Sequence, residues 1–347
     1  MPASGSYRSQ GFCLYSSSSL SSFVFGPFRP LSLVAGDLGL KSGVLIHPVE
    51  GRVEDQFAFN LDDYKTALKE ARAQGKVVRA VLLCNPANPL GTILTRAQLT
   101  SLVEWVRSEP GLHLVADEIY ALSTFGHLHS SADQSASFLA RLNPFAGPPR
   151  ASSPFVSLAS VLDTPEAMGD RFHVIYAFSK DFGISGFRAG VIYTENRAVH
   201  RAYGQLSQFN GLSTDVQHFI YLLLSDERVL GNYIVRMQAQ LAAVVSMVLE
   251  ILDEAQIPYV RPQAALFLWV DFSAFLSAPT AAAEMELYEL ILAEANVNLT
   301  PGTIFNSPVP GWFRICHSSE PKETIRVALQ RIVKVLKARR AQQALQA

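Results

Sequence analysis

The chain has 347 residues, 49% of them hydrophobic, which is enough to build one large domain or two of medium size. Its 29 Lys and Arg residues balance 30 Asp and Glu residues for a formal net charge of -1, so charge gives no reason to expect binding to nucleic acid or to an anionic membrane. Three widely spaced cysteines argue against a disulfide framework and against a zinc site, so we expect a cytoplasmic protein with no metal centre. The longest apolar stretch, residues 241–252, contains Ser246 and Glu250 and is too short to span a bilayer.

Residues 1–41 differ in composition from the rest of the chain. They are rich in serine, and no acidic residue precedes Asp37. We expect an unpatterned, disordered leader here. An organellar transit peptide is the less favoured alternative, because Arg8 and Arg29 are a weak signal for one.

From residue 42 to residue 194, apolar strands alternate with amphipathic helices. One helix is expected between Asn60, a suitable cap, and Gly75; a second follows the capping box of Thr95 and Gln98 and reaches Ser108. Such alternation is typical of an α/β domain with a mostly parallel sheet. The predicted strands are 44–49, 77–84, 112–116, 173–178 and 189–193, with an irregular stretch at about 126–170.

After residue 194 the pattern becomes helical and then mixed. Apolar faces predict helices near 195–206, 213–225, 227–255 and 280–295, short strands at 258–260, 265–270, 297–300 and 312–316, and a final helix with Ile325, Leu329, Ile332 and Leu336 on one side. We therefore expect a large α/β domain over residues 42–230 and a smaller C-terminal α+β domain over residues 231–340.

One lysine stands in a short polar loop between two of the predicted buried strands. The loop, residues 179–186, contains Ser179 and Lys180, and Arg188 follows it closely. A lysine beside apolar strands and a second cation is a usable amine nucleophile, suited to a Schiff base with an aldehyde. The alternative is a surface lysine in a turn, as most lysines are exposed.

Two further polar groups follow predicted strands, at the edge where open α/β sheets bind their ligands. Asn88 lies in the turn NPANPLG after the strand at 77–84, and two Asn-Pro steps leave its amide free to bond outward. Asp117 closes the strand at 112–116 and needs a cationic partner if buried, which a protonated pyridine nitrogen would satisfy; Tyr120 could reach the same ligand. A connecting turn and a helix cap remain the alternative interpretations.

Arg314 lies in the apolar strand predicted at 312–316. A buried arginine needs an anion, and its planar guanidinium suits a carboxylate bidentately. A structural salt bridge is the alternative to a ligand carboxylate.

Together these groups are what pyridoxal 5′-phosphate (PLP) needs to act on an α-amino acid. In this order and spacing, NPANPLG, DEIY, SKDFGISGFRAG and GWFRIC resemble the class I/II aminotransferase family, and within it the 1-aminocyclopropane-1-carboxylate synthases and synthase-like proteins. The resemblance covers residues 42–340. It implies the fold type I architecture of PLP-dependent transferases, with a mostly parallel large-domain sheet and a smaller C-terminal α+β domain.

The resemblance also implies a role for each residue. Lys180 would form the internal aldimine and move the Cα proton, Asp117 would pair with the ring nitrogen, and Asn88 and Tyr120 would bond the ring hydroxyl oxygen. Other residues would hold the cofactor and the substrate: Ser179 beside the lysine, Arg188 on the cofactor phosphate, and Arg314 on the substrate carboxylate. The implied assembly is a homodimer.

The chain departs from the family pattern at its N-terminal end. Family members have a longer segment before the strand equivalent to 44–49, with a phosphate-binding loop, an aromatic residue stacked on the cofactor and a tyrosine lent by the partner subunit; none of these can be assigned here. We therefore expect an N-terminally incomplete large domain. Ala177 also replaces a hydroxyl often found three residues before the lysine.

The sequence predicts a PLP-dependent enzyme that acts on a small amino acid, by transamination or by synthase/lyase chemistry. The alternative is a truncated, catalytically impaired family member that serves as a dimerising scaffold. The substrate and the choice between the two reactions stay open.

Overall fold

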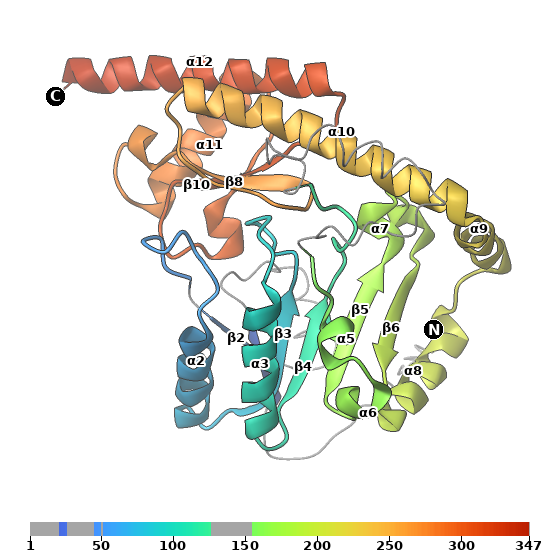
Figure 1. Cartoon of the computed structure of the whole chain (residues 1–347). Helices are drawn as coiled ribbons and strands as arrows, with labels where there is room; N and C mark the ends of the chain where they lie inside the picture. Colours follow the sequence, from blue (N-terminus) through green and yellow to red (C-terminus); the bar gives the residue numbers. More distant parts are fainter. Residues whose placement is uncertain (1–20, 26–44, 50, 126–154, 347) are drawn as a thin grey trace, which may run out of the picture.

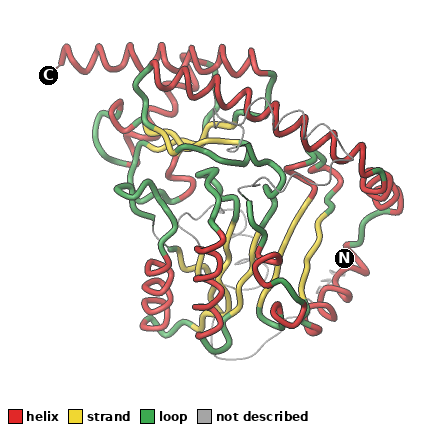
Figure 2. Tube along the Cα trace, viewed as in Figure 1, coloured by secondary structure: helices red, strands yellow, loops and turns green. Residues whose placement is uncertain are grey.

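The computed structural model describes residues 21–25, 45–49, 51–125 and 155–346. These residues form two separate β-sheets with helices around them, and the long helix α10 (Glu227–Glu254) runs from one sheet to the other (Figures 1 and 2). The predicted domain boundary at 230/231 falls inside this helix.

The large sheet has six strands in the order β2-β1-β3-β4-β5-β6. All neighbours are parallel except β5 and β6, which pair antiparallel. The predicted, mostly parallel sheet is therefore confirmed. Its strands are β1 (Ser21–Phe25), β2 (Leu45–Pro48), β3 (Val77–Cys84), β4 (His113–Asp117), β5 (Phe172–Ala177) and β6 (Gly190–Thr194).

The prediction of a wholly disordered leader over residues 1–41 is wrong for β1. Residues Ser21–Phe25 form an internal strand that pairs with β2 on one side and with β3 on the other. The run Phe-Val-Phe consists of good strand formers, but it is too short to stand out within a serine-rich segment. The rest of the predicted leader lies outside the described residues.

Helices α2 (Leu61–Ala73) and α3 (Arg96–Ser108) cover one face of this sheet (Figure 1). Both predicted N-terminal caps are confirmed. The Asn60 side chain accepts a hydrogen bond from Asp62 N, and Thr95 with Gln98 forms the full capping box. These helices and strands enclose the large-domain core, which includes Leu68, Leu102 and Leu114.

The segment predicted as irregular contains two short helices in its described part. They are α5 (Leu158–Leu162) and α6 (Pro165–Met168), capped by Ser157 and Thr164. The buried Glu118 carboxylate accepts a hydrogen bond of 2.7 Å from Leu158 N at the start of α5. Helices of this length are below what hydrophobic periodicity can detect, so the prediction missed them. Residues 126–154 lie outside the described part.

Three helices follow the large sheet: α8 (Arg197–Asn210), α9 (Thr214–Ser225) and α10. By length and composition alone, α10 could cross a membrane, and it is longer than the apolar run seen in the sequence. Its C-terminal half packs in the core of the second sheet through Leu241, Val245 and Leu252. A core helix of this kind can have the same length and composition as a membrane-spanning helix.

The second sheet has four antiparallel strands in the order β7-β8-β10-β9. Helix α12 (Lys322–Gln346) and the C-terminal half of α10 lie over it (Figure 1). The four residues predicted on the buried side of the last helix are 6% exposed or less, which confirms that helix. The remaining elements are β7 (Tyr259–Val260), β8 (Phe267–Asp271), α11 (Ala281–Ala295), β9 (Thr300–Pro301) and β10 (Trp312–Cys316), with 3-10 turns at Ser273–Phe275 and Gly302–Phe305.

The strand predicted at 297–300 is shorter than expected, because only Thr300 and Pro301 pair with β10. A small apolar cluster joins the two sheets. Phe57 and Leu90 from the large domain pack with Trp269, Phe305 and Trp312 from the small one. This contact fixes the second sheet beside the carboxyl ends of the large-sheet strands.

Candidate active site

The predicted site residues lie at one edge of the large sheet. Cys84 at the end of β3 is opposite Asp117 in β4, and Asp117 is opposite Ile175 in β5, so these parallel strands end together. The antiparallel β6 starts at this same edge, because Ala177 pairs with Gly190. The topology therefore brings three of the four motifs, NPANPLG, DEIY and SKDFGISGFRAG, to one edge of the large sheet, whereas GWFRIC lies in the second sheet.

The turn after β3 is held from both sides. Asn85 N donates to the Asp117 carbonyl oxygen at 3.0 Å, and Asn85 Oδ1 accepts from Leu94 N at 3.0 Å. Gly91 has φ +69°, and a Cβ atom there would lie 2.8 Å from the Ala264 carbonyl oxygen of the small domain. Only glycine permits this close approach between the two domains.

Asn88 and Arg314, far apart in the sequence, meet at this edge. Arg314 Nη1 donates to Asn88 Oδ1 at 3.2 Å, and Arg314 Nη2 donates to Thr300 Oγ1 at 3.4 Å. The guanidinium also lies over the rings of Phe267 and Phe305, at 5.2 and 4.9 Å from their centroids. The turn after β3 and strand β10 are thus in direct contact through this hydrogen bond.

Arg314 has no carboxylate within ion-pair distance among the described residues; every ion pair there joins other groups. Its Nε is buried and has no hydrogen-bond partner in the described part of the chain. Burial lowers the guanidinium pKa, and the nearby Tyr120 and Cys316 act against this. The structural salt bridge that the sequence left open is therefore not formed by any described residue.

Asp117 lies half-buried at the end of β4. Its Oδ1 accepts a hydrogen bond of 3.2 Å from Ile119 N, within a turn, so the helix-cap interpretation is wrong. Burial raises the pKa of this carboxyl to about 6, against the smaller effect of the Ile119 bond. No cation of the described residues pairs with it, so it is suited to a cationic ligand group.

Tyr120 is buried in the turn after Asp117 and packs edge-on against Phe267, with ring centroids 5.3 Å apart. Burial, followed by the nearby Cys84, raises the pKa of its hydroxyl. The hydroxyl is therefore a neutral donor at neutral pH. We call Asn88, Asp117, Tyr120 and Arg314 the inner group.

Ser179, Lys180 and Arg188 form the outer group. Lys180 and Arg188 are exposed, and Ser179 is half-buried. Arg188 Nη1 donates to the Ser185 carbonyl oxygen at 3.0 Å, and its backbone has φ 55°. The structure thus leaves both cationic side chains of this group open toward solvent.

Two details of the lysine segment differ from the prediction. Lys180 lies in the short helix α7 (Phe178–Asp181), followed by a 3-10 turn at Ser185–Phe187, and not in an open loop. Its side chain is exposed and not enclosed by the apolar strands. The reason is local: Phe178 packs inward, and one helical turn then directs the lysine to the surface.

The sequence prediction missed the neighbour of the lysine. Asp181 is 1% exposed and accepts hydrogen bonds from Leu122 N, Ser123 Oγ and the Tyr176 hydroxyl. A weak signal was available, because Asp181 lies directly before Phe182 and three residues after Phe178, and an aspartate buried among aromatic residues needs several donors.

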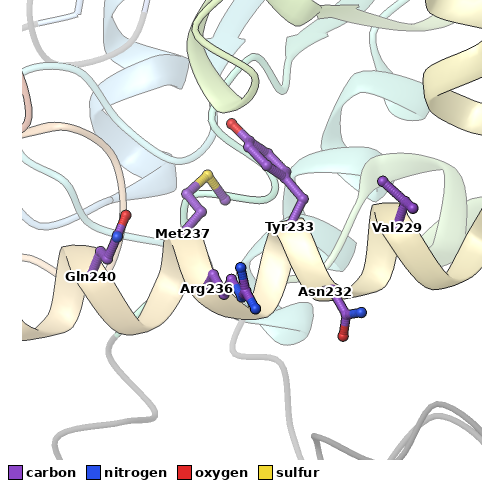
Figure 3. Close-up of a pocket in the computed structure, with 6 residues that line it drawn as sticks. All are labelled: Val229, Asn232, Tyr233, Arg236, Met237 and Gln240. Carbon is purple, nitrogen blue, oxygen red and sulfur yellow. The ribbon is translucent and has the colours of Figure 1, made fainter.

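Two cavities are lined by described residues outside the predicted site. One of about 520 Å³ runs along α10, and its described lining comes from that helix alone: Val229, Asn232, Tyr233, Arg236, Met237 and Gln240 (Figure 3). The other, of about 290 Å³, lies between α11 and β9 and includes Thr300, which bonds Arg314. The described lining of neither cavity contains a predicted site residue.

The residues present fit PLP by the chemistry of their donors. An unpaired carboxylate suits a pyridinium nitrogen, an exposed lysine suits an aldehyde, and an arginine suits a phosphate. Arg314, with a free buried Nε, suits the carboxylate of an amino acid.

Known proteins match most of the chain. The 1-aminocyclopropane-1-carboxylate synthase 2 of Oryza sativa subsp. japonica is 35% identical over 332 residues, which are 95% of this chain and 63% of that protein. The 1-aminocyclopropane-1-carboxylate synthase of Malus domestica is 33% identical over 302 residues, 85% of this chain and 58% of that protein. The chain spans about three fifths of the length of these curated relatives.

Solved structures share the fold. An aromatic aminotransferase from Pyrococcus horikoshii superposes with a TM-score of 0.73 at 22% identity, covering 94% of this chain and 75% of that one. A Thermus thermophilus aspartate aminotransferase mutant gives 0.71 at 19% identity, covering 91% and 74%. These likenesses confirm the predicted fold type I architecture.

The sequence profile of the family described as aminotransferase class I and II matches residues 38–332, which is most of the chain. Members of this family depend on PLP. The predicted family is confirmed, and the chain belongs to the class I and II aminotransferases.

Proposed function

We propose that this chain binds PLP covalently through Lys180 and uses it to transform a small α-amino acid. The observation that carries the proposal is a pair of unmatched charges at one sheet edge. Asp117 lacks a cation and Arg314 lacks a carboxylate among the described residues, and the exposed Lys180 follows the neighbouring strand. Together they suit a pyridinium and an amino-acid carboxylate.

When bound, PLP supplies an electron sink for charge that develops at the amino acid's Cα. In this proposal Asp117 keeps a proton on the ring nitrogen, and Tyr120 and Asn88 orient the ring through its hydroxyl oxygen. Arg188 would bind the cofactor phosphate, and Ser179, next to the lysine, would also contact the cofactor. Arg314 would bind the substrate carboxylate, and its Nε has no hydrogen-bond partner among the described residues.

Lys180 has two tasks in this proposal. Its Nζ would hold the cofactor at its aldehyde carbon, and the same nitrogen would take the Cα proton of the bound amino acid. The relatives named 1-aminocyclopropane-1-carboxylate synthase favour an elimination, whereas those named aminotransferase favour transfer of the amino group. We propose an amino acid of small side chain as substrate for either outcome.

The experiment combines cofactor loading with half-reactions. PLP-loaded protein should develop an absorbance band that Lys180→Ala lacks, while exposed Lys322→Ala on α12 keeps it. Amino acids are then added without a keto acid. Accumulation of the amine form of the cofactor would identify a transaminase; product release with the band retained would identify an eliminating enzyme. A parent chain that gains no band would contradict the proposal and favour the scaffold alternative.

We further propose that the chain works as a homodimer in the cytoplasm. Apolar side chains of the three consecutive elements β6, α8 and α9 are exposed, and exposed apolar surface of this kind is typical of an association site. The exposed residues are Val191, Tyr193, Tyr203, Leu206, Phe219, Tyr221, Leu222 and Leu224.

Light scattering across a concentration series tests the dimer. Leu222→Asp should dissociate it, whereas Val327→Asp, a comparably exposed apolar position on α12, should not. A parent chain that stays monomeric throughout would contradict this part of the proposal. Imaging of the tagged chain in cells tests the compartment, and accumulation in an organelle would contradict it.

A further inference from the structure

We propose that Asp181 is a positioning residue: it fixes the segment that carries Lys180 against the turn that carries Asp117 and Tyr120. This inference rests on the proposed function, because it assigns Asp181 a role in placing the lysine.

The carboxylate of Asp181 connects the two segments directly. It is 1% exposed and accepts from Leu122 N at 2.9 Å and from Ser123 Oγ at 2.5 Å, both in the turn after β4. Tyr176, at the end of β5, donates its hydroxyl to the same carboxylate at 3.1 Å. One buried side chain therefore joins the ends of β4 and β5, where Asp117 and Lys180 are attached.

No cation of the described residues pairs with this carboxylate; each bond just named comes from a neutral donor. Burying a carboxylate on neutral donors alone is costly, and it stays ionised only where several donors converge on it. Such an arrangement tolerates little movement, since the loss of one donor leaves a buried charge less satisfied. This rigidity suits a residue adjacent to a reactive amine.

Helix α10 supports the same connection from the other side. The Tyr233 hydroxyl donates to the Asp181 carbonyl oxygen at 2.7 Å, and its ring stacks on Phe182 with centroids 5.3 Å apart. Gln238 Nε2, further along α10, donates to the Leu122 carbonyl oxygen at 2.9 Å and to Thr124 Oγ1 at 3.1 Å. Figure 3 shows Tyr233 projecting from α10 on the side away from Asn232.

Because α10 continues into the small domain, this network links the lysine segment to the sheet that carries Arg314. The position of Lys180 relative to Asp117 and Arg314 then depends on Asp181 and its donors. A shift of about 1 Å between reacting groups can cost about 100-fold in rate, so the loss of this connection should be visible in the chemistry of the lysine.

The test compares Asp181→Asn with Glu284→Gln. Glu284 is also a fully buried carboxylate on neutral donors, Thr303 N and Gly311 N, but it lies in the small domain. Asparagine presents an NH₂ group to donors and so loses at least one bond. Tyr233→Phe removes only the bond to the peptide carbonyl and should have a weaker effect in the same direction.

The first readout needs no cofactor. Hydrogen exchange by mass spectrometry should rise in peptides covering residues 118–125 and 176–188 of Asp181→Asn, and stay at the parent level in β10. In Glu284→Gln, exchange should rise in β10 and stay at the parent level in the peptides covering residues 118–125 and 176–188. The second readout is the rate at which added PLP becomes reducible onto Lys180 by borohydride, measured well below each melting temperature; Asp181→Asn should be about 10- to 100-fold slower.

In turnover assays kcat should fall with the amino-acid KM nearly unchanged, because the contacts of Arg314 and Asn88 remain. Unchanged exchange in both peptides, or attachment within about twofold of the parent, would overturn the inference. Equal slowing in Glu284→Gln would overturn it too, since stability alone would then explain the effect. If the parent chain never attaches PLP, the proposed function fails, whereas the exchange data still decide whether Asp181 holds the two segments together.

Discussion

The inner and the outer group of the site are built differently. The inner group lies among contacts from both domains: Arg314 bonds Asn88 and lies over Phe267, which in turn packs against Tyr120. In the outer group, Lys180 and Arg188 are exposed, and the neighbouring strand β6 leaves Val191 52% exposed and Tyr193 42% exposed. Half of the site is thus enclosed within one chain, and the other half faces outward.

In the proposed function, this difference assigns ligand recognition to the inner group and covalent attachment of the cofactor to the outer group. Groups held between two domains keep their geometry without a ligand, so the inner group is preorganised to recognise a cation and a carboxylate. The segment that carries Lys180 is held chiefly by the buried side chain of its neighbour Asp181. Substitutions in the inner group should therefore change binding and turnover of a loaded protein, while those in the outer group should change loading itself.

The largest effect in the inner group is expected from Asp117→Asn. Asparagine keeps the acceptor for Ile119 N but loses the charge that would hold a proton on the ring nitrogen. Turnover should fall about 100- to 1,000-fold with the cofactor still bound. Steady-state kinetics of PLP-loaded protein measures this.

A matched control separates charge from turn structure. Asp271, at the end of β8, accepts from Ser273 N at 2.7 Å in the same way, so Asp271→Asn should leave turnover near the parent value. Turnover of Asp117→Asn within about tenfold of the parent, a barrier change of about 1.4 kcal/mol, would mean that Asp117 only shapes its turn.

A smaller effect is expected from Arg314→Lys. An ammonium cannot reproduce the planar pair of donors, so the loss of one charge-assisted contact should weaken amino-acid binding by about 10- to 150-fold, or roughly 1.5–3 kcal/mol. Titration of the cofactor band with amino acid measures affinity, and the melting temperature of the same sample should change little.

Arg339→Lys is the control for this substitution, because Arg339 pairs with Glu286 at the surface of the small domain. The affinity of Arg339→Lys for the amino acid should equal that of the parent protein. A lowered melting temperature of Arg314→Lys with unchanged affinity would show that Arg314 is structural, and the inner group would then not recognise a carboxylate.

The last effect concerns the pH dependence of stability near the inner group. His317 follows β10, is fully buried against Phe125, and has no partner for either ring nitrogen among the described residues. Burial lowers its pKa to about 4. Because the unfolded side chain titrates near 6.5, the unfolded state binds more protons between pH 4 and 6.5, and stability falls as the pH falls through that window.

His317→Leu should remove up to about 3 kcal/mol of this pH dependence. Denaturant unfolding of cofactor-free protein at several pH values measures it. His173, whose pKa is also lowered to about 4, changes stability with pH in the same direction as His317. Asp117, whose pKa is raised to about 6, changes it in the opposite direction. Both residues are present in the parent and in the variant, so their contributions cancel when the two proteins are compared. Equal slopes for the two proteins would contradict this.

Much of the fold was predictable because local signals agreed with the final packing. The caps at Asn60 and Thr95 and the strand at Val77–Cys84 needed no distant contact. Strand β1 was missed because its stability comes from pairing on both sides, which no local pattern records. The short helices α5 and α6 were missed because each is only one turn long.

The members of the site were predictable by their cost. A charged residue within or at the end of an apolar strand needs an explanation, and this singled out Asp117 and Arg314. The contact between Arg314 and Asn88 could not be predicted, since it depends on how the small domain docks. Asp181 was missed because it follows the polar residues Ser179 and Lys180 and does not end an apolar strand, so little in the sequence indicates that it is buried.

The central claim is that Lys180 holds the cofactor. PLP-treated protein is reduced with borohydride, digested with trypsin and mapped by mass spectrometry. Modification blocks cleavage after Lys180, so the account predicts the label on a single peptide, residues 172–188, which Lys180→Ala loses. A label on another lysine, or a label spread over the seven other lysines and the N-terminal amine, as a nonspecific reagent would give, would contradict this assignment.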